Sequence, residues 1–128
     1  MNYYFSKTLR VSFDEAIARV TEALERDGFG ILTEIDVKET LKKKLNVDFR
    51  RYKILGVCNP PYAYKALQLE DKIGLMLPCN VIVHELPKGK VEVAAIDPVA
   101  SMAAVENPKL REVGQEVRAK LKAVIDNL

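Results

Sequence analysis

Five helix-start signals divide this chain into short alternating pieces and constrain its fold more than any other feature. A capping residue followed three positions later by glutamate, or followed directly by proline, is typical of a helix N-terminus. The signals are Ser12 with Glu15, Asp36 with Glu39, Asn59-Pro60, Asp97-Pro98 and Asn107-Pro108. Apolar or alternating runs of strand length lie between them. The sequence therefore predicts a succession of short strands and helices.

The order of these elements indicates the fold class. Strands are expected over 3–9, 30–35, 52–58, 79–86 and 91–96, with a long helix at the C-terminus. The last two strands should form a hairpin around a two-residue loop, Lys88-Gly89, which places Asn80 opposite Asp97 and Cys79 opposite Pro98. The pattern predicts an α+β fold with a mainly antiparallel sheet of about five strands. A doubly wound α/β fold is the alternative, although the glycine fingerprint of its nucleotide sites is missing.

Apolar spacing predicts which side of each helix is buried. The helix after Asn59 should bury Ala63, Ala66 and Leu67, and the helix after Asp36 should group its apolar residues, including Leu45, on one side. Gly114 lies beside the apolar stripe of the last helix, where it would allow a close approach to the neighbouring element. These stripes predict one core shared by the sheet and its helices.

Length and composition favour a small globular protein. The 128 residues are the size of one domain, taken here as 1–128, and 48% of them are hydrophobic. Such a chain can bury a core without disulfides or a structural metal. No run approaches the roughly 20 apolar residues of a membrane helix, and the first residues lack the layout of a signal peptide. We therefore expect a cytoplasmic protein with no membrane partner and with reduced thiols.

Positive charge is concentrated in one segment. Residues 38–53 contain seven basic and two acidic residues, hence +5, against −3 for the rest of a chain whose net charge is +2. Such a segment could contact phosphates. Lys42, Lys43 and Lys44, however, occupy the outward turns of an amphipathic helix, and a solvated helix face is the ordinary interpretation. A nucleic-acid partner is therefore not expected.

The residues that suggest chemistry are two Cys-Asn dipeptides, each at the junction of an apolar strand and a proline. Cys58 ends one predicted strand and Cys79 begins another, so both dipeptides should lie at the same edge of the sheet, together with Asp97. The candidate site is therefore Cys58, Asn59, Cys79, Asn80 and Asp97. We expect the two cysteine Cα atoms within about 10 Å of each other, whereas a disulfide needs less than about 7 Å.

The candidate residues admit a chemical and a structural interpretation. Cys58 precedes a helix N-terminus, whose dipole favours a thiolate and lowers a thiol pKa. The structural alternative is that both cysteines are small buried apolar groups, that Asn59 is a helix cap and that Asn80 satisfies backbone groups.

No metal or cofactor is predicted from these residues. His84 is the single histidine, and its odd spacing from Cys79 points it to the opposite sheet face. Zinc needs more ligands than the cysteine pair offers, although two thiolates leave a soft metal such as Cu(I) open.

Four segments carry a resemblance to a known family. Residues 29–37, the Gly56-Val57-Cys58-Asn59-Pro60 segment, the Leu77-Pro78-Cys79-Asn80-Val81 segment and Asp97-Pro98 resemble the bacterial and archaeal family called domain of unknown function 302. The resemblance implies a compact α+β domain with a curved antiparallel sheet, similar in outline to TATA-binding-protein-like folds, and a homodimer. It implies no established activity, cofactor or catalytic residue.

Two main hypotheses about function follow, and neither establishes whether the protein is an enzyme. In the first, the chain is a small-ligand-binding or thiol-redox module with its site around the two Cys-Asn dipeptides. In the second, it is a non-catalytic homodimeric scaffold in which the same residues make turns. Nucleic-acid binding through residues 38–53 is a third.

Overall fold

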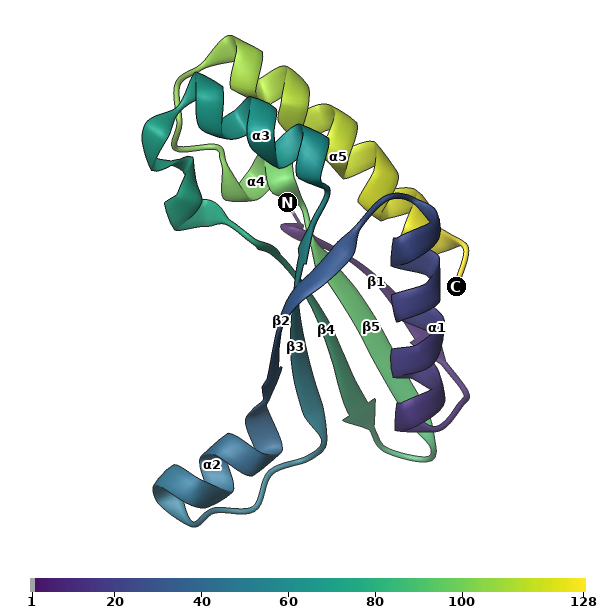
Figure 1. Cartoon of the computed structure of the whole chain (residues 1–128). Coiled ribbons are helices and arrows are strands. Elements are labelled where there is room, and N and C mark those ends of the chain that lie inside the picture. The colour runs from purple at the N-terminus through teal and green to yellow at the C-terminus, as the bar shows by residue number, and fades with distance from the viewer. Residues whose placement is uncertain (1) are drawn as a thin grey trace.

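The computed structural model describes residues 2–128 and shows one five-stranded sheet (Figure 1). Its strands are β1 (Tyr4–Leu9), β2 (Gly30–Asp36), β3 (Tyr52–Cys58), β4 (Cys79–Leu86) and β5 (Lys90–Ile96). They lie in the order β1-β5-β4-β3-β2, and every neighbouring pair is antiparallel. The predicted α+β class is confirmed, and the parallel α/β alternative is wrong.

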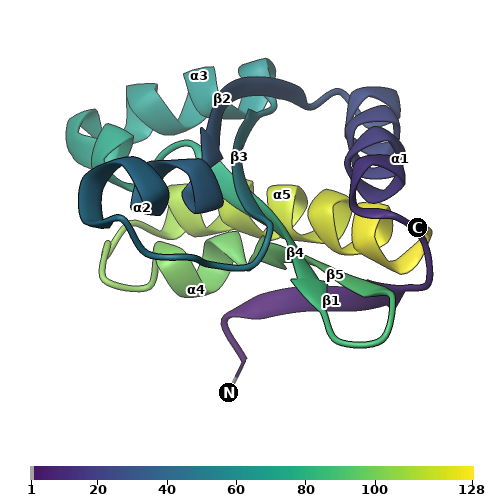
Figure 2. The same ribbon diagram turned by 90° about the horizontal axis from the view of Figure 1, so that it is seen from below.

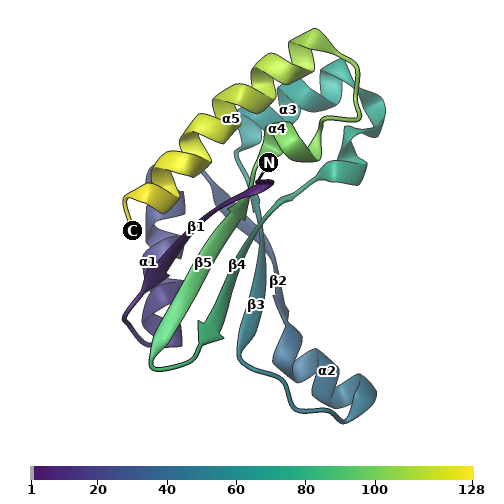
Figure 3. The ribbon, with the colours of Figure 1, turned by 180° about the vertical axis from the view of Figure 1, so that it is seen from behind.

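Helices cover one face of this sheet. They are α1 (Phe13–Arg26), α2 (Val37–Leu45), α3 (Pro60–Leu69), α4 (Pro98–Ser101) and α5 (Pro108–Asp126), with a 3₁₀ helix η1 (Asp71–Met76). The helices α1, α3 and α5 lie on one side of the sheet, and within residues 2–128 no helix packs across the opposite face of β1, β4 and β5, with α2 and α4 lying at the two ends of the sheet (Figure 1 and Figure 2). The short helix α2 projects from the far end of β2 and β3, and it buries none of its residues (Figure 3).

Most of the predicted helix starts are formed by side-chain caps. The Ser12 hydroxyl accepts a hydrogen bond from the Glu15 backbone N–H at 3.1 Å, and the Asp36 carboxylate accepts one from Glu39 at 3.0 Å. Asn107 accepts from the first turn of α5. Residues with positive φ follow two of the helices, since Gly28 after α1 has a φ of 84° and Asn46 after α2 has a φ of 52°. Both values are left-handed backbone conformations that stop a helix.

The core lies in two clusters. The larger one fills the space between the sheet and the helices α1 and α5, and the smaller one joins α3, η1 and the start of α5. The predicted α5 stripe is confirmed, since Leu110, Val113, Val117, Leu121 and Val124 are all buried. Leu67 is 44% exposed, so its predicted burial is wrong, and Leu45 in α2 is 66% exposed.

The predicted register of the last hairpin is wrong by one residue. Leu86 pairs with Lys90, so the loop contains the three residues 87–89. Pro87 has no N–H to donate to the strand ladder, which favours its place in the loop. Val81 pairs with Ala95, and by extension Asn80 falls opposite Ile96 instead of Asp97.

No helix within residues 2–128 is long and apolar enough to cross a membrane.

Candidate functional site

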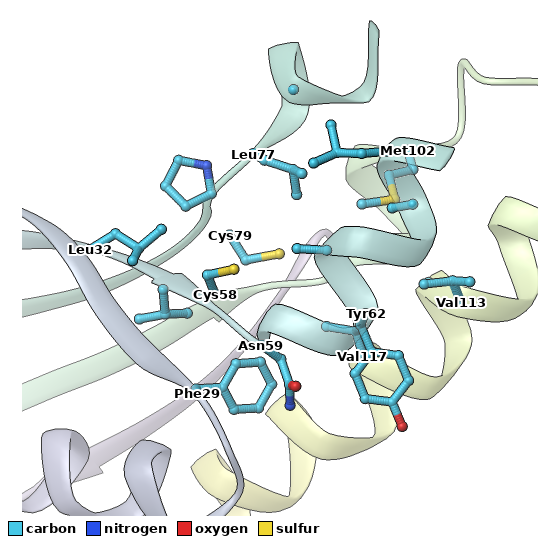
Figure 4. Close-up of a pocket in the computed structure, with 17 residues that line it drawn as sticks. Phe29, Leu32, Cys58, Asn59, Tyr62, Leu77, Cys79, Met102, Val113 and Val117 are labelled. Atoms are coloured by element: carbon cyan, nitrogen blue, oxygen red, sulfur yellow. The ribbon is translucent and has the colours of Figure 1, made fainter. Parts of the chain in front are cut away.

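An apolar cavity of about 320 Å³ lies where the ends of the sheet meet α3 and α5 (Figure 4). It is bounded by six separate parts of the chain, because β2 with the preceding Phe29, β3, α3, the η1–β4 connection, Met102 after α4, and α5 all contribute to its wall. The side chains that define it include Phe29, Leu32, Val57, Cys58, Asn59, Tyr62, Leu67, Leu77, Cys79, Met102, Val113 and Val117. We call this cavity the cysteine pocket.

The two cysteines lie together at this end of the sheet, as the sequence predicts. Val57 is the cross-strand partner of Cys79, so Cys58 lies one position further along the neighbouring strand. Partner Cα atoms in an antiparallel pair are about 4.5–5.5 Å apart, which brings the two cysteines within the predicted 10 Å. Both side chains point into the cysteine pocket (Figure 4). Both cysteines are free thiols.

Burial keeps the two thiols protonated. Removal from water raises the pKa of Cys79 to about 11, and the neighbouring Cys58 raises it further in the same direction. Burial also raises the pKa of Cys58 above 9.0, so the expectation of a lowered Cys58 pKa is wrong. Removal from water penalises the charged thiolate directly, and this is the cause of the raised Cys58 pKa. At neutral pH both groups are uncharged S–H groups.

Asn59 occupies the cap position of α3 without making a side-chain cap. Its side chain forms no hydrogen bond to the first turn of α3. Its Nδ2 instead donates to the backbone carbonyl of Asp27, 3.3 Å away, at the end of α1. The predicted cap is therefore wrong, and the amide joins α1 to the β3–α3 junction. The same amide lies at the wall of the cysteine pocket and is buried there.

The other two candidate residues lie outside the cysteine pocket. Asn80 is exposed and lines a hollow on the helix-free face, because side chains alternate between faces along β4. Asp97 is buried and accepts hydrogen bonds from the Val99 N–H at 2.9 Å and from Arg118 Nε at 3.0 Å. It therefore starts α4 and binds α4 to α5. The structure brings together Cys58, Asn59 and Cys79.

Gly56 holds the backbone geometry behind the two cysteines. A Cβ built on it would lie 2.7 Å from Pro78 Cγ and still closer to Thr33 Oγ1. Real Cβ atoms do not approach other atoms so closely, so only glycine fits between β2 and the Leu77-Pro78 turn, whose peptide bond is cis. This packing sets the place of Pro78 in the pocket wall.

Two leucines of the cysteine pocket are partly exposed. Leu32 and Leu67 line the cavity and are 65% and 44% exposed. Leu75 is 86% exposed and follows Gly74, which also lines the cavity. Exposed apolar side chains beside an apolar cavity are typical of sites where other molecules bind.

The polar and acidic residues do not assemble a metal centre. Within residues 2–128, no three of the His, Cys, Asp and Glu side chains come together as possible ligands. His84 lies on the opposite face from Cys79, as predicted, where it pairs with Tyr52 across the strands. The cysteine pocket therefore offers two neutral thiols, one amide and one phenol within an apolar wall.

These features define a small α+β protein with one helix-covered sheet face and an apolar pocket at its end. The family model described as "Domain of unknown function DUF302" matches residues 5–128, and the chain belongs to this family. A solved relative is an uncharacterised conserved DUF302 protein from Bacillus stearothermophilus, with 28% sequence identity and a TM-score of 0.91. The match covers 98% of both chains. No curated protein matches the sequence.

Proposed function

We propose that the protein binds a small, uncharged, largely apolar molecule in the cysteine pocket. The observation that supports this most strongly is the cavity itself, whose volume of about 320 Å³ is within the range of known ligand sites. Its wall carries few polar groups, and a charged ligand would lose solvation there without compensation. The Asn59 amide and the Tyr62 phenol could orient a ligand that carries one polar end.

The partly exposed leucines of the pocket support the same proposal. Leu32 and Leu67 line the cavity and are partly exposed, so an apolar ligand could contact them at the protein surface as well as in the pocket. Burial of those side chains by the ligand would add about 25 cal/mol per Å² of apolar area. The exposed leucines would then have a role in binding and none in folding.

A thiol-redox function is less well supported. Attack on a disulfide or peroxide needs a thiolate, and burial raises the pKa of both Cys58 and Cys79. The cysteines fit better as soft, polarisable parts of the pocket wall. Redox chemistry would need a ligand or partner that lowers these pKa values.

A homodimeric scaffold is the second candidate, because the helix-free sheet face exposes apolar side chains, with Ile35 48% and Tyr4 39% exposed. We place the dimer in the cytoplasm and treat residues 1–128 as a single domain. Light scattering at micromolar concentration tests the dimer, and a pure monomer would contradict it.

Nucleic acid is a less suitable partner, since Lys42 pairs with Asp48 and Lys43 of the exposed helix α2 pairs with Glu39.

Ligand binding can be tested with the neutral dye N-phenyl-1-naphthylamine, whose fluorescence rises in apolar surroundings. The variant Ala63→Phe fills the cysteine pocket from α3, and Ala119→Phe adds the same ring to an exposed position of α5. We expect the parent and Ala119→Phe to bind the dye and Ala63→Phe to bind it roughly tenfold more weakly, a difference of about 1.4 kcal/mol. Circular dichroism establishes that all three are folded. Equal binding by folded Ala63→Phe, or no binding by the parent, would contradict the proposal.

A further inference from the structure

A second hollow lies on the opposite face of the sheet from the cysteine pocket. Its volume is about 390 Å³, and its wall includes the three tyrosines Tyr3, Tyr4 and Tyr52 together with Glu92. We call it the tyrosine hollow. The tyrosine hollow and the cysteine pocket have no lining residue in common, so the two sites are separate.

Strand register explains why the hollow forms. Glu92, Ala94 and Ile96 share one face of β5, since side chains alternate along a strand. Tyr4 pairs with Ile96, whereas Glu92 pairs with His84, which in turn pairs with Tyr52. The cross-strand row that contains Tyr4 and Ile96 is therefore separated from the row that contains Glu92 and His84 by the distance from Ile96 to Glu92 along β5. This distance is about 13 Å at roughly 3.3 Å per residue.

Small side chains between these two rows leave the space open. Ala94 pairs with Ile82 in the intervening row, and both line the hollow. The methyl group of Ala94 cannot fill the gap between the tyrosine wall and the Glu92 wall. The hollow therefore has an apolar floor, an aromatic wall on one side, and a carboxylate beside an aromatic ring on the other.

A chain of hydrogen bonds fixes the carboxylate. Arg50 Nε donates to His84 Nδ1 at 3.1 Å, so Nδ1 must act as an acceptor. The proton of a neutral His84 ring is then on Nε2, which lies 2.8 Å from Glu92 Oε1 and donates to it. His84 is buried and lies against Tyr52, with ring centroids 5.1 Å apart. One oxygen of Glu92 is thus held by a rigid, buried partner.

The charge carried by the residues that line the tyrosine hollow is negative. Glu92 is the charged residue among those that line it, and within residues 2–128 it forms no salt bridge with a lysine or an arginine. The faces of tyrosine rings carry negative potential and attract cations. One face of the Tyr52 ring is already covered by the Arg50 guanidinium, 5.4 Å from the ring centroid, so Tyr3 and Tyr4 are the rings that remain for a cation. An oriented carboxylate together with these two rings favours a positively charged guest over a neutral or anionic one.

We propose that the tyrosine hollow binds a small organic cation, such as a quaternary ammonium or a protonated amine. The carboxylate of Glu92 supplies the counter-charge, and the tyrosines supply cation–π contacts and apolar area. His84 and Arg50 act as positioning residues that hold Glu92. The shape between the two walls suits a compact ammonium head group.

The test compares choline with 3,3-dimethyl-1-butanol, which has the same shape and no charge. Binding to the purified full chain is measured by isothermal titration and by saturation-transfer NMR of the ligand methyl groups. We expect choline to bind at least roughly tenfold more tightly than the neutral alcohol, because only choline gains the ionic and cation–π terms.

Single substitutions test whether choline binds in the tyrosine hollow. Glu92→Gln keeps the size of the side chain and removes its charge, and it should weaken choline binding roughly tenfold or more. Glu22→Gln, at an exposed position of α1, is the matched control and should change nothing. Tyr4→Leu, also expected to weaken binding, serves as the test if Glu92→Gln does not fold.

Three results would overturn the proposal. They are equal binding of choline and the neutral alcohol, unchanged choline binding in folded Glu92→Gln, and a stable dimer in light scattering that binds no choline. None of these results depends on the cysteine pocket, so the two proposals can fail separately.

Discussion

At the scale of single residues, Gly56 and Gly114 differ in whether the structure leaves room for a side chain. A Cβ on Gly56 would overlap Thr33 and Pro78, whereas one on Gly114 would meet Val99 Cγ2 at 3.8 Å and Met102 Sδ at 3.9 Å, which is ordinary contact. Gly56→Ala should therefore lower the free energy of unfolding by roughly 1–3 kcal/mol.

Gly114→Ala is the matched control for that substitution. It should raise the free energy of unfolding by up to about 1 kcal/mol, because alanine favours the helix interior. Urea unfolding of both variants measures the two effects. A stable Gly56→Ala variant would show that β2 and the turn at Pro78 can separate without cost.

Asn59 provides a second test at residue scale, because its amide donates to Asp27 and does not cap α3. Asn59→Asp keeps an oxygen acceptor and loses the donor, so it should lower the free energy of unfolding by about 1 kcal/mol or more. Ser12→Asp, at a true cap, should be nearly neutral, since aspartate accepts equally well there. Parent-like stability of Asn59→Asp in urea unfolding would restore the cap interpretation.

At the scale of elements, α2 and α5 differ in how they contribute to stability. Leu121 of α5 is fully buried between the sheet and α1, whereas Leu45 of α2 is 66% exposed. Leu121→Ala should lower the free energy of unfolding by about 2–5 kcal/mol, and Leu45→Ala should change it by less than about 0.5 kcal/mol. Thermal unfolding of the two variants provides the comparison. A large loss in Leu45→Ala would mean that another molecule covers α2.

The elements also show how far the sequence could predict the structure. Local signals were sufficient where the hydrogen-bond partner is near in the chain, as with the helix caps at Ser12 and Asp36. The hairpin register was wrong because Pro87 joins the loop, which changes which residues face each other. The shift of one residue changes the cross-strand partner of Asn80 from Asp97 to Ile96, whereas alternation along β4 places the Asn80 side chain on the opposite face from Cys79.

Non-local partners explain the remaining differences at the candidate site. Asn59 binds a carbonyl 32 residues away, and no pattern around Asn59 indicates it. Phe29, Tyr62, Met102 and Val117 come from four segments whose apolar residues look like ordinary core. Their shared cavity arises only when α3 and α5 pack at the end of the sheet. The two cysteines were the sole local indication of its position.

At the scale of the whole molecule, the buried thiols link stability to pH. The pKa of Cys79 rises from 9.0 to about 11 on folding. Between these values the unfolded chain loses the thiol proton and the folded chain keeps it, so the free energy of unfolding should fall as pH rises above about 9. This contribution is fully present below pH 9.

Cys79→Ala removes the thiol, so the free energy of unfolding should fall less steeply as pH rises above about 9. Val81→Ala, a buried truncation on the same strand and face, should leave the slope unchanged. Urea unfolding of each variant between pH 8 and pH 11, relative to its own value at pH 8, gives the slopes. Identical slopes in the parent and Cys79→Ala would show that Cys79 is solvated in the native state.

The position of β1 at the edge of the sheet affects how the protein is made. Tyr4 pairs with Ile96, and the ribosome adds about 5–20 residues per second. The first strand therefore waits on the order of 5–20 s for its partner to be synthesised. During that time its unpaired backbone can be bound by other chains. A nascent-chain chaperone that shields residues 4–9 would meet this need.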